Sequence, residues 1–197
     1  MTKIYIETYG CSANVADSER MAGLLKEAQF DIVNTSEDAD LVILNTCTVK
    51  GPSEDKFWRR LKEIQKTYKI VVVAGCIAQT DYKKLKRFPL VGTKQIHKVV
   101  EVVEEALNDN VIREISMEEM PGLNLPTIRK NPIIEIIPIS TGCLGACSFC
   151  KTKAARGNLQ SYPIDDILTK AQKAVNGGIR EIWITSQDCG CYGFDID

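Results

Sequence analysis

The sequence has a single histidine, few aromatic residues and no apolar run long enough to span a membrane. His97 is the only histidine among 197 residues, and aromatic side chains make up 7% of the chain. Acidic and basic residues interrupt every apolar stretch within a few positions, and no signal peptide precedes Lys3. We therefore expect a soluble, cytoplasmic protein that does not associate with a membrane.

The chain also lacks an excess of charge of either sign. Lysine and arginine total 25 against 26 for aspartate and glutamate, so the net charge at neutral pH is −1. This balance neither requires nor excludes a nucleic-acid partner, because a basic patch can lie on one face of a neutral protein. The composition leaves the class of partner open.

Cysteine, by contrast, is abundant, with eight residues in the chain. In a reducing compartment, grouped cysteines indicate metal binding or catalysis. Cys143, Cys147 and Cys150 form a CxxxCxxC run within the segment STGCLGACSFCKTKAARG. Three thiolates at this spacing can hold three irons of a 4Fe–4S cube and leave the fourth free for another ligand. The alternatives are a zinc site, which usually needs a second cysteine pair or histidine, and a group of reduced, buried thiols.

The periodicity of apolar residues predicts an α/β fold for residues 1–110. Strand-like runs alternate with helical patterns, which favours a parallel, doubly wound sheet. The expected strands are Lys3–Tyr9, Asp31–Asn34, Leu41–Asn45 and Ile70–Ala74. The expected helices are Asp17–Ala28, a helix capped by Ser53 with Phe57, Leu61, Ile64 and Tyr68 on one side, and His97–Leu107.

Residues 111–132 break this rhythm, because prolines, a glycine and charged residues are interspersed there, and we interpret them as an interdomain linker. The β/α pattern restarts in residues 133–197. A strand at Ile133–Ile139 precedes the cysteine loop, Pro163 opens a helix that Gly177 and Gly178 stop, and Glu181–Thr185 forms the next strand. One such unit cannot close a barrel, so we expect the second domain to be truncated.

A second set of cysteines is scattered along the sequence. Cys11, Cys47 and Cys76 each follow a predicted strand. In an open parallel sheet, ligands bind outside the carboxyl ends of the strands, so these thiols can converge if the strands are neighbours. Gly10 and Gly75 would let the backbone turn closely around a bulky group. The pattern predicts a shared metal site; the alternative is three ordinary buried cysteines.

Taken together, the motifs resemble the radical S-adenosylmethionine (SAM) methylthiotransferases. The resemblance rests on ETYGCSANVADSERM, NTCTVKGPSE, AGCIAQ, the CxxxCxxC loop and EIWITSQDCGCYG. The phrase CSFCKTKAARGNLQSYP is similar to the archaeal and eukaryotic branch that modifies threonylcarbamoyladenosine in tRNA. The resemblance implies a Rossmann-like N-terminal domain, a partial TIM-type barrel and a small RNA-binding barrel, of which this chain would contain the first and the start of the second.

The resemblance also implies the cofactors and the reaction. Two 4Fe–4S clusters are expected, a radical-SAM cluster on Cys143, Cys147 and Cys150 and an auxiliary cluster on Cys11, Cys47 and Cys76. With SAM, and with an electron donor such as ferredoxin or flavodoxin, the enzyme would methylthiolate carbon 2 of the modified adenosine next to the anticodon. The fragment is expected to be inactive alone. The alternatives are methylthiolation of an aspartate on a ribosomal protein, methylthiolation of isopentenyladenosine in tRNA, and a non-enzymatic metal-binding module.

Two further residues are assigned to cofactor binding. Arg156 lies in the loop nearest the CxxxCxxC run, where it could meet phosphates or the cofactor carboxylate. Gln187 occupies a position where relatives commonly have glutamate, which puts a charge-based role towards SAM in doubt. Cys189 and Cys191 are additional thiols that the family pattern does not require, and we interpret them as incidental.

Overall fold

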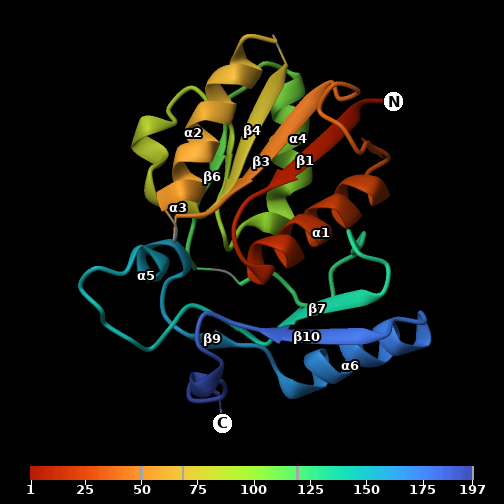
Figure 1. The fold of residues 1–197 in the computed structure, drawn as a ribbon, viewed down its shortest axis with the longest axis vertical. Helices are drawn as coiled ribbons and strands as arrows, with labels where there is room; N and C mark the ends of the chain where they lie inside the picture. Colours follow the sequence, from red (N-terminus) through yellow and green to blue (C-terminus); the bar gives the residue numbers. More distant parts are fainter. Residues whose placement is uncertain (49–50, 68, 119, 197) are drawn as a thin grey trace.

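The computed structural model describes residues 1–48, 51–67, 69–118 and 120–196. Its upper layer in Figure 1 is an α/β unit built on a parallel sheet, and its lower layer is a smaller β/α unit near the C-terminus. The expected helical position Tyr68 lies outside the described residues. Within the described ranges, no helix combines the length and the apolar content that a membrane span requires.

The larger sheet has six strands in the order β2-β1-β3-β4-β5-β6, and each adjacent pair is parallel. The strands are β1 (Lys3–Thr8), β2 (Asp31–Ile32), β3 (Leu41–Thr46), β4 (Ile70–Gly75), β5 (Leu90–Val91) and β6 (Arg113–Glu114). All six residues of β3 are buried, as the unbroken apolar run predicts for a central strand covered on both faces. The predicted Rossmann-like α/β class is therefore confirmed.

Helices cover both faces of this sheet. Because side chains alternate along a strand, Leu41 and Ile43 face the core formed with α1 (Ser12–Glu27) and α4 (Val99–Leu107). Val42 and Leu44 face the opposite core. There α2 (Gly51–Gln65) contributes Phe57, Leu61 and Ile64, and α3 (Cys76–Thr80) contributes Ile77 and Ala78. Short 3-10 turns η1 (Tyr82–Lys84) and η2 (Ile96–Lys98) complete the unit.

Helix α1 begins at Ser12, whereas the apolar pattern predicted a start at Asp17. Its first two turns carry polar residues, and the pattern therefore assigned them to a loop. Asn14, Asp17 and Arg20 are nonetheless buried, at 1%, 2% and 3% exposure. Each of the three side chains makes hydrogen bonds inside the protein, which a search for apolar spacing cannot detect.

The second unit is built on the parallel pair β7 (Ile134–Pro138) and β10 (Glu181–Thr185). The antiparallel pair β8 (Ser140–Thr141) and β9 (Gln160–Ser161) flanks the cysteine loop, and α5 (Lys151–Arg156), α6 (Ile164–Asn176) and η3 (Cys189–Cys191) follow the chain order. Ile167 and Ala171 of α6 pack against Ile137 and Tyr162. The rest of the apolar side of α6 is open, since Ile164, Leu168 and Val175 are 62%, 59% and 55% exposed.

The stretch 111–132 is packed against the first unit along much of its length. Strand β6 lies within it and extends the sheet by pairing with β5. Further on, the backbone N–H of Ile128 donates to the Glu19 carbonyl at 2.9 Å. Gly23 of α1 lies so close that a Cβ there would stand 2.3 Å from the Pro126 carbonyl. The stretch predicted as a linker therefore joins the two units while lying against α1.

Candidate metal centre

Three cysteines from three neighbouring strands line one cavity at the carboxyl edge of the sheet. Cys11, Cys47 and Cys76 follow β1, β3 and β4, which are adjacent in the strand order. The cavity has a volume of about 210 Å³. Cys47 and Cys76 are 2% and 3% exposed, whereas Cys11 is exposed. The structure thus brings together the sulfurs that the sequence predicted to converge.

Two glycines allow the backbone to turn tightly around this cavity. Gly10 has a φ of 107°, and a Cβ there would lie 2.5 Å from Cβ and 2.8 Å from Sγ of Cys47. Gly75 has a φ of 83°, and its added Cβ would lie 2.3 Å from Oδ1 of Asn45. Both positions combine a left-handed conformation with a close approach, so no other residue fits without displacing a neighbour.

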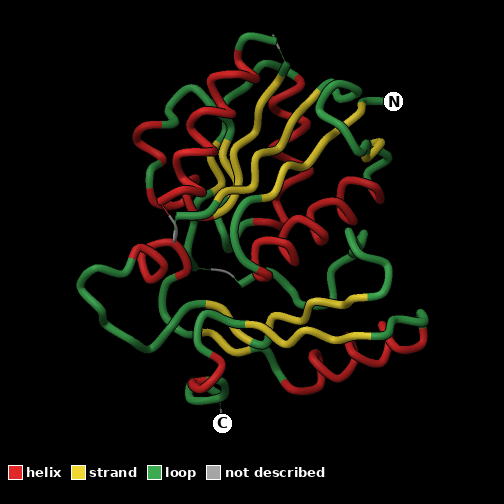
Figure 2. Tube along the Cα trace, viewed as in Figure 1, coloured by secondary structure: helices red, strands yellow, loops and turns green. Residues whose placement is uncertain are grey.

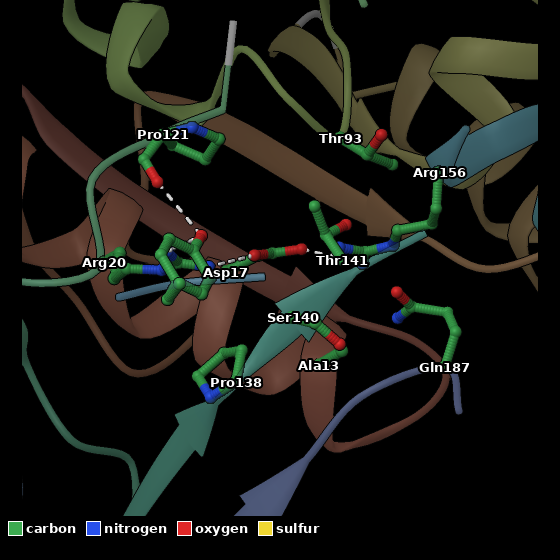
Figure 3. Close-up of a pocket in the computed structure, with 11 residues that line it drawn as sticks. Ala13, Asp17, Arg20, Thr93, Pro121, Pro138, Ser140, Thr141, Arg156 and Gln187 are labelled. Carbon is green, nitrogen blue, oxygen red and sulfur yellow. Dashed lines mark hydrogen bonds and ion pairs between the residues drawn. The ribbon is translucent and has the colours of Figure 1, made fainter. Parts of the chain in front are cut away.

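Of the described residues that line the cavity, Arg156 alone carries a charge. It is 5% exposed, and its Nη2 donates to Oδ2 of Asp17 at 2.7 Å and to Oδ1 of Asn14 at 3.0 Å. Arg20 donates to the other carboxylate oxygen of Asp17, also at 2.7 Å (Figure 3). Burial alone would lower the pKa of Arg156, but the Asp17 carboxylate and the sulfurs of Cys76 and Cys11 raise it, so the guanidinium stays charged.

The thiol of Cys76 responds to both burial and this cation. Removal from water raises the pKa of Cys76, and the positive charge of the Arg156 guanidinium offsets part of that increase. Burial disfavours a thiolate because the interior solvates charge poorly, whereas a cation or a metal stabilises it. The cavity therefore favours thiolates only when positive charge accompanies them.

Three other cysteines, Cys143, Cys147 and Cys150, form the second trio, and Cys11, Cys47 and Cys76 form the first. The second trio lies on the irregular loop between β8 and α5, which Figure 2 shows in green. A Cβ on Gly145 would lie 3.3 Å from Sγ of Cys143 and 4.0 Å from Sγ of Cys147, so these sulfurs flank the same glycine. Cys150 directly precedes α5, and the backbone N–H of Lys153 lowers the pKa of its thiol. Cys147 is exposed, and Cys143 and Cys150 are half-buried. A metal group from solvent can therefore reach all three sulfurs.

Hydrogen bonds hold both ends of this loop, one within the second unit and one to the first unit. Oε1 of Gln187 accepts a hydrogen bond from the N–H of Gly142 at 2.7 Å, one residue before Cys143. The hydroxyl of Thr93 donates to the Ala155 carbonyl at 2.6 Å. Helix α5 packs against α3, which begins at Cys76. The loop of the second trio is thereby attached to the wall of the first cavity.

The two residues assigned to cofactor binding, Arg156 and Gln187, both line the cavity of Cys11, Cys47 and Cys76. The structure thus places Arg156 in a buried ion pair beside the first trio. Cys191 is buried and Cys189 is exposed, with the Ser186 hydroxyl 3.3 Å from the Cys189 sulfur. All eight cysteines are free thiols.

The donor set determines which metal groups fit. Among residues 1–48, 51–67, 69–118 and 120–196, no three His, Cys, Asp or Glu side chains stand close enough together to hold one ion. The three sulfurs instead surround a space, and thiolates are the usual ligands of iron–sulfur clusters, whose irons lie apart from one another. This arrangement fits a multi-iron group better than a single zinc ion. The second trio offers the same ligand type on an exposed loop.

The sequence did not indicate Asn14, Asp17 or Arg20 as part of the site. These residues occupy successive turns of α1 and support Arg156, which is 139 residues away from Asp17. One signal was available, because aspartate and arginine spaced i, i+3 on a helix can form an ion pair. The same spacing is common on solvated helix faces, so burial was the missing information.

Comparison with known proteins matches residues 3–93 to the family described as "Uncharacterized protein family UPF0004". The "Threonylcarbamoyladenosine tRNA methylthiotransferase" of Mus musculus is 48% identical over 203 residues, which cover 98% of this chain and 35% of that protein. The "Probable threonylcarbamoyladenosine tRNA methylthiotransferase" of Methanothermobacter thermautotrophicus is 44% identical over 199 residues, which cover 98% of this chain and 47% of that protein.

A third relative, the "Probable threonylcarbamoyladenosine tRNA methylthiotransferase" of Pyrococcus horikoshii, is 37% identical over 201 residues, which cover 100% of this chain and 47% of that protein. The chain spans between about a third and a half of the length of these curated relatives, from 35% to 47%. Eukaryotic and archaeal relatives alike match nearly all of it. The chain therefore belongs to the methylthiotransferase family, within the branch whose members are named threonylcarbamoyladenosine tRNA methylthiotransferases.

Proposed function

We propose that this chain supplies the two cysteine sites of an enzyme that methylthiolates carbon 2 of N6-threonylcarbamoyladenosine next to the anticodon of tRNA. The proposal includes radical SAM chemistry and two 4Fe–4S clusters. The observation that carries it is the cavity in which Cys11, Cys47 and Cys76 meet, with the CxxxCxxC segment attached to its wall. The names of the relatives support the choice of tRNA and of the modified nucleoside.

The residues of each site have separate tasks in this proposal. Cys143, Cys147 and Cys150 hold one cluster on the open loop, where a site with three protein ligands keeps a place for SAM. When bound, that cluster and SAM supply the one-electron chemistry that cleavage of an aromatic C–H bond requires and that no side-chain acid or base can provide. Cys11, Cys47 and Cys76 hold the second cluster.

The protein around these ligands orients them and excludes water. Gln187 and Thr93 hold the two ends of the CxxxCxxC segment through hydrogen bonds of 2.7 and 2.6 Å. The near-complete burial of Cys47 and Cys76 keeps solvent from two of the three ligands in the first cavity. Cys11, being exposed, leaves one side of the cavity open for the group that is to react. These features favour a buried sulfur site that opens towards a substrate.

Partners beyond tRNA follow from the same proposal. The cluster on the open loop requires an external electron donor, which we propose to be a ferredoxin or a flavodoxin in the cytoplasm. Exposed basic side chains lie near η1, at Lys83, Lys84, Lys86 and Arg87. Contacts of lysine and arginine with phosphates supply a large share of the affinity of proteins for nucleic acids. Lys84 is already paired with Asp81 at 2.7 Å, so the other three are the stronger candidates for contacts with tRNA.

Anaerobic reconstitution with iron and sulfide tests the metal assignment. The wild-type chain should bind two 4Fe–4S clusters, as measured by iron, acid-labile sulfide and EPR spectra of the reduced protein. Replacement of Cys143, Cys147 and Cys150 by Ala should remove one cluster, and replacement of Cys11, Cys47 and Cys76 by Ala should remove the other. Cys189→Ser is the matched control and should retain both. Zinc without labile sulfide would instead support the metal-binding module and refute the proposal.

The choice of substrate needs a separate test in cells. Mass spectrometry of tRNA nucleosides should detect the methylthiolated form of threonylcarbamoyladenosine when the full-length protein is present and lose it when the gene is deleted. Full-length protein with all six proposed ligands replaced by Ala should not restore it. Loss of methylthiolated isopentenyladenosine, or of a modified ribosomal aspartate, would identify one of the alternative reactions instead.

A further inference from the structure

We propose that the buried group formed by Asp17, Arg20 and Arg156 is a positioning device that places one uncompensated positive charge beside the cavity of Cys11, Cys47 and Cys76. Through Arg156 this charge stabilises the anionic form of the metal group that the cavity holds. The inference rests on the proposed auxiliary cluster. It goes further by assigning a role to three side chains that are not metal ligands.

The group is compact and almost fully removed from water. Asp17 accepts from Arg156 and from Arg20, one on each carboxylate oxygen, and both N–O distances are 2.7 Å. The exposures of the three residues are 2%, 3% and 5% for Asp17, Arg20 and Arg156. Figure 3 shows Asp17 between the two arginines, with Gln187 on the side of Arg156. Burial and the ion pair with Asp17 therefore hold both guanidinium groups in fixed positions.

The charges in this group do not cancel. Two guanidinium groups share one carboxylate, and the remaining hydrogen-bond partners of Arg20 are the neutral Gly122 carbonyl and Tyr162 hydroxyl. Nε of Arg20 is buried without a hydrogen-bond partner among the described residues. A second ionic group contains Glu19 and Glu135 with Arg129 and Lys170. Its two carboxylates and two cations are equal in number, so it has no excess negative charge to offer.

A buried charge is costly unless an opposite charge faces it. Arg156 lines the same cavity as Cys11, Cys47 and Cys76, so its guanidinium faces all three thiols across that space. Thiolates are the form in which cysteines bind metal, so a loaded cavity presents negative charge to this guanidinium. The negative charge of the group bound in the cavity therefore neutralises the excess positive charge of Asp17, Arg20 and Arg156. An ion pair with a purely structural role would be neutral without such a ligand.

The same contact fixes the position of the second trio. Asp17 belongs to α1, which begins just after Cys11, and Arg156 ends α5, which begins just after Cys150. The 2.7 Å ion pair thus joins the segments that carry the two proposed clusters. Asn14, on the same face of α1, adds a second acceptor for Arg156 at 3.0 Å.

The test measures a reduction potential in a chain that can hold only the auxiliary cluster. Cys143, Cys147 and Cys150 are replaced by Ala as the background, and the reconstituted protein is reduced stepwise and followed by EPR. Loss of positive charge in Arg156→Met should move the midpoint potential to a more negative value, because reduction adds an electron to the cluster. Arg156→Lys, which keeps the charge, should lie closer to the background protein. Arg180→Met removes an exposed arginine of the second unit and should leave the potential unchanged.

Asp17→Asn gives the decisive comparison, because it removes a negative charge and should shift the potential in the opposite direction from Arg156→Met. Damage to the fold would affect both variants in the same direction, and circular dichroism and thermal unfolding report such damage separately. Equal potentials in all variants, or shifts of the same sign, would overturn this inference while leaving two clusters in the wild-type chain. A background protein that binds no cluster would overturn the proposed auxiliary site itself, and the inference with it.

Discussion

Replacement of Gly23 by Ala tests whether the stretch 111–132 is docked on α1. Gly23 lies in the middle of α1, where alanine would ordinarily stabilise a helix by about 1 kcal/mol. In this structure the added Cβ would stand 2.3 Å from both C and O of Pro126 and 2.5 Å from N of Thr127. These are backbone atoms, so the clash cannot be relieved by rotation of a side chain.

The expected result follows from the balance of these two effects. Overpacking a filled site costs about 1–3 kcal/mol, and contact with backbone places this case at the upper end. After subtraction of the gain in helix propensity, we expect the free energy of unfolding to fall by about 1–2 kcal/mol. Urea unfolding followed by circular dichroism measures the change as a lower midpoint with an unaltered slope.

The matched control is Gly51→Ala, at the first residue of α2. Among the described residues outside its own helical turn, no heavy atom would lie within 4 Å of a Cβ at Gly51, so alanine should be neutral or stabilising there. Limited proteolysis adds an independent readout, because Gly23→Ala should increase cleavage in the displaced segment around Pro126 and Gly51→Ala should not. If Gly23→Ala were as stable as the wild type or more stable, the contact between this segment and α1 would be refuted.

Two further substitutions test burial and exposure. Burial raises the pKa of Glu19, so the contribution of this carboxyl group to stability is present below the ordinary glutamate pKa of 4.5 and is lost as the pH rises through the higher pKa of the folded protein. The stability of Glu19→Gln relative to wild type, measured by urea titration, should therefore increase between about pH 4 and pH 7. A difference that stays constant over this range would contradict the prediction. Leu168→Ser, at a position 59% exposed, should change the unfolding free energy by less than about 0.5 kcal/mol, and a loss above about 2 kcal/mol would show that this face of α6 is covered.

The sequence pattern predicted the elements in which one physical signal dominates. Strand β3 was predicted to within one residue because it is an unbroken apolar run, and β10 was predicted with both ends correct because its β-branched and aromatic residues contrast with the glycines before it. Strand β6 was missed, since Arg113 and Glu114 carry no apolar signal and pair only through their backbone. The start of α1 was missed because the buried residues near its N-terminus, Ala13, Asn14 and Ala16, are small or polar and give no strong apolar signal.

The candidate site likewise has one part that the sequence could predict and one part that it could not. The convergence of Cys11, Cys47 and Cys76 could be predicted, because parallel strands bring their carboxyl ends to one edge whatever the details of packing. The ionic group behind them could not, since the contact between Asp17 and Arg156 joins residues 139 positions apart and depends on how the second unit docks. Local periodicity contains no information on such docking.

The position of α5 has a consequence for how the two cysteine sites would work together. Helix α5 contacts α3 on one side and, through Arg156, the Asp17 carboxylate on the other, so the segment after Cys150 cannot move without disturbing the wall of the first cavity. The loop before it, from Cys143 to Cys150, is irregular and largely exposed. A rigid helix therefore follows a loop that can adapt to its ligands, and only the loop is free to rearrange when a bulky group binds. This division allows the second site to be filled without changing the separation that the ion pair sets between α1 and α5.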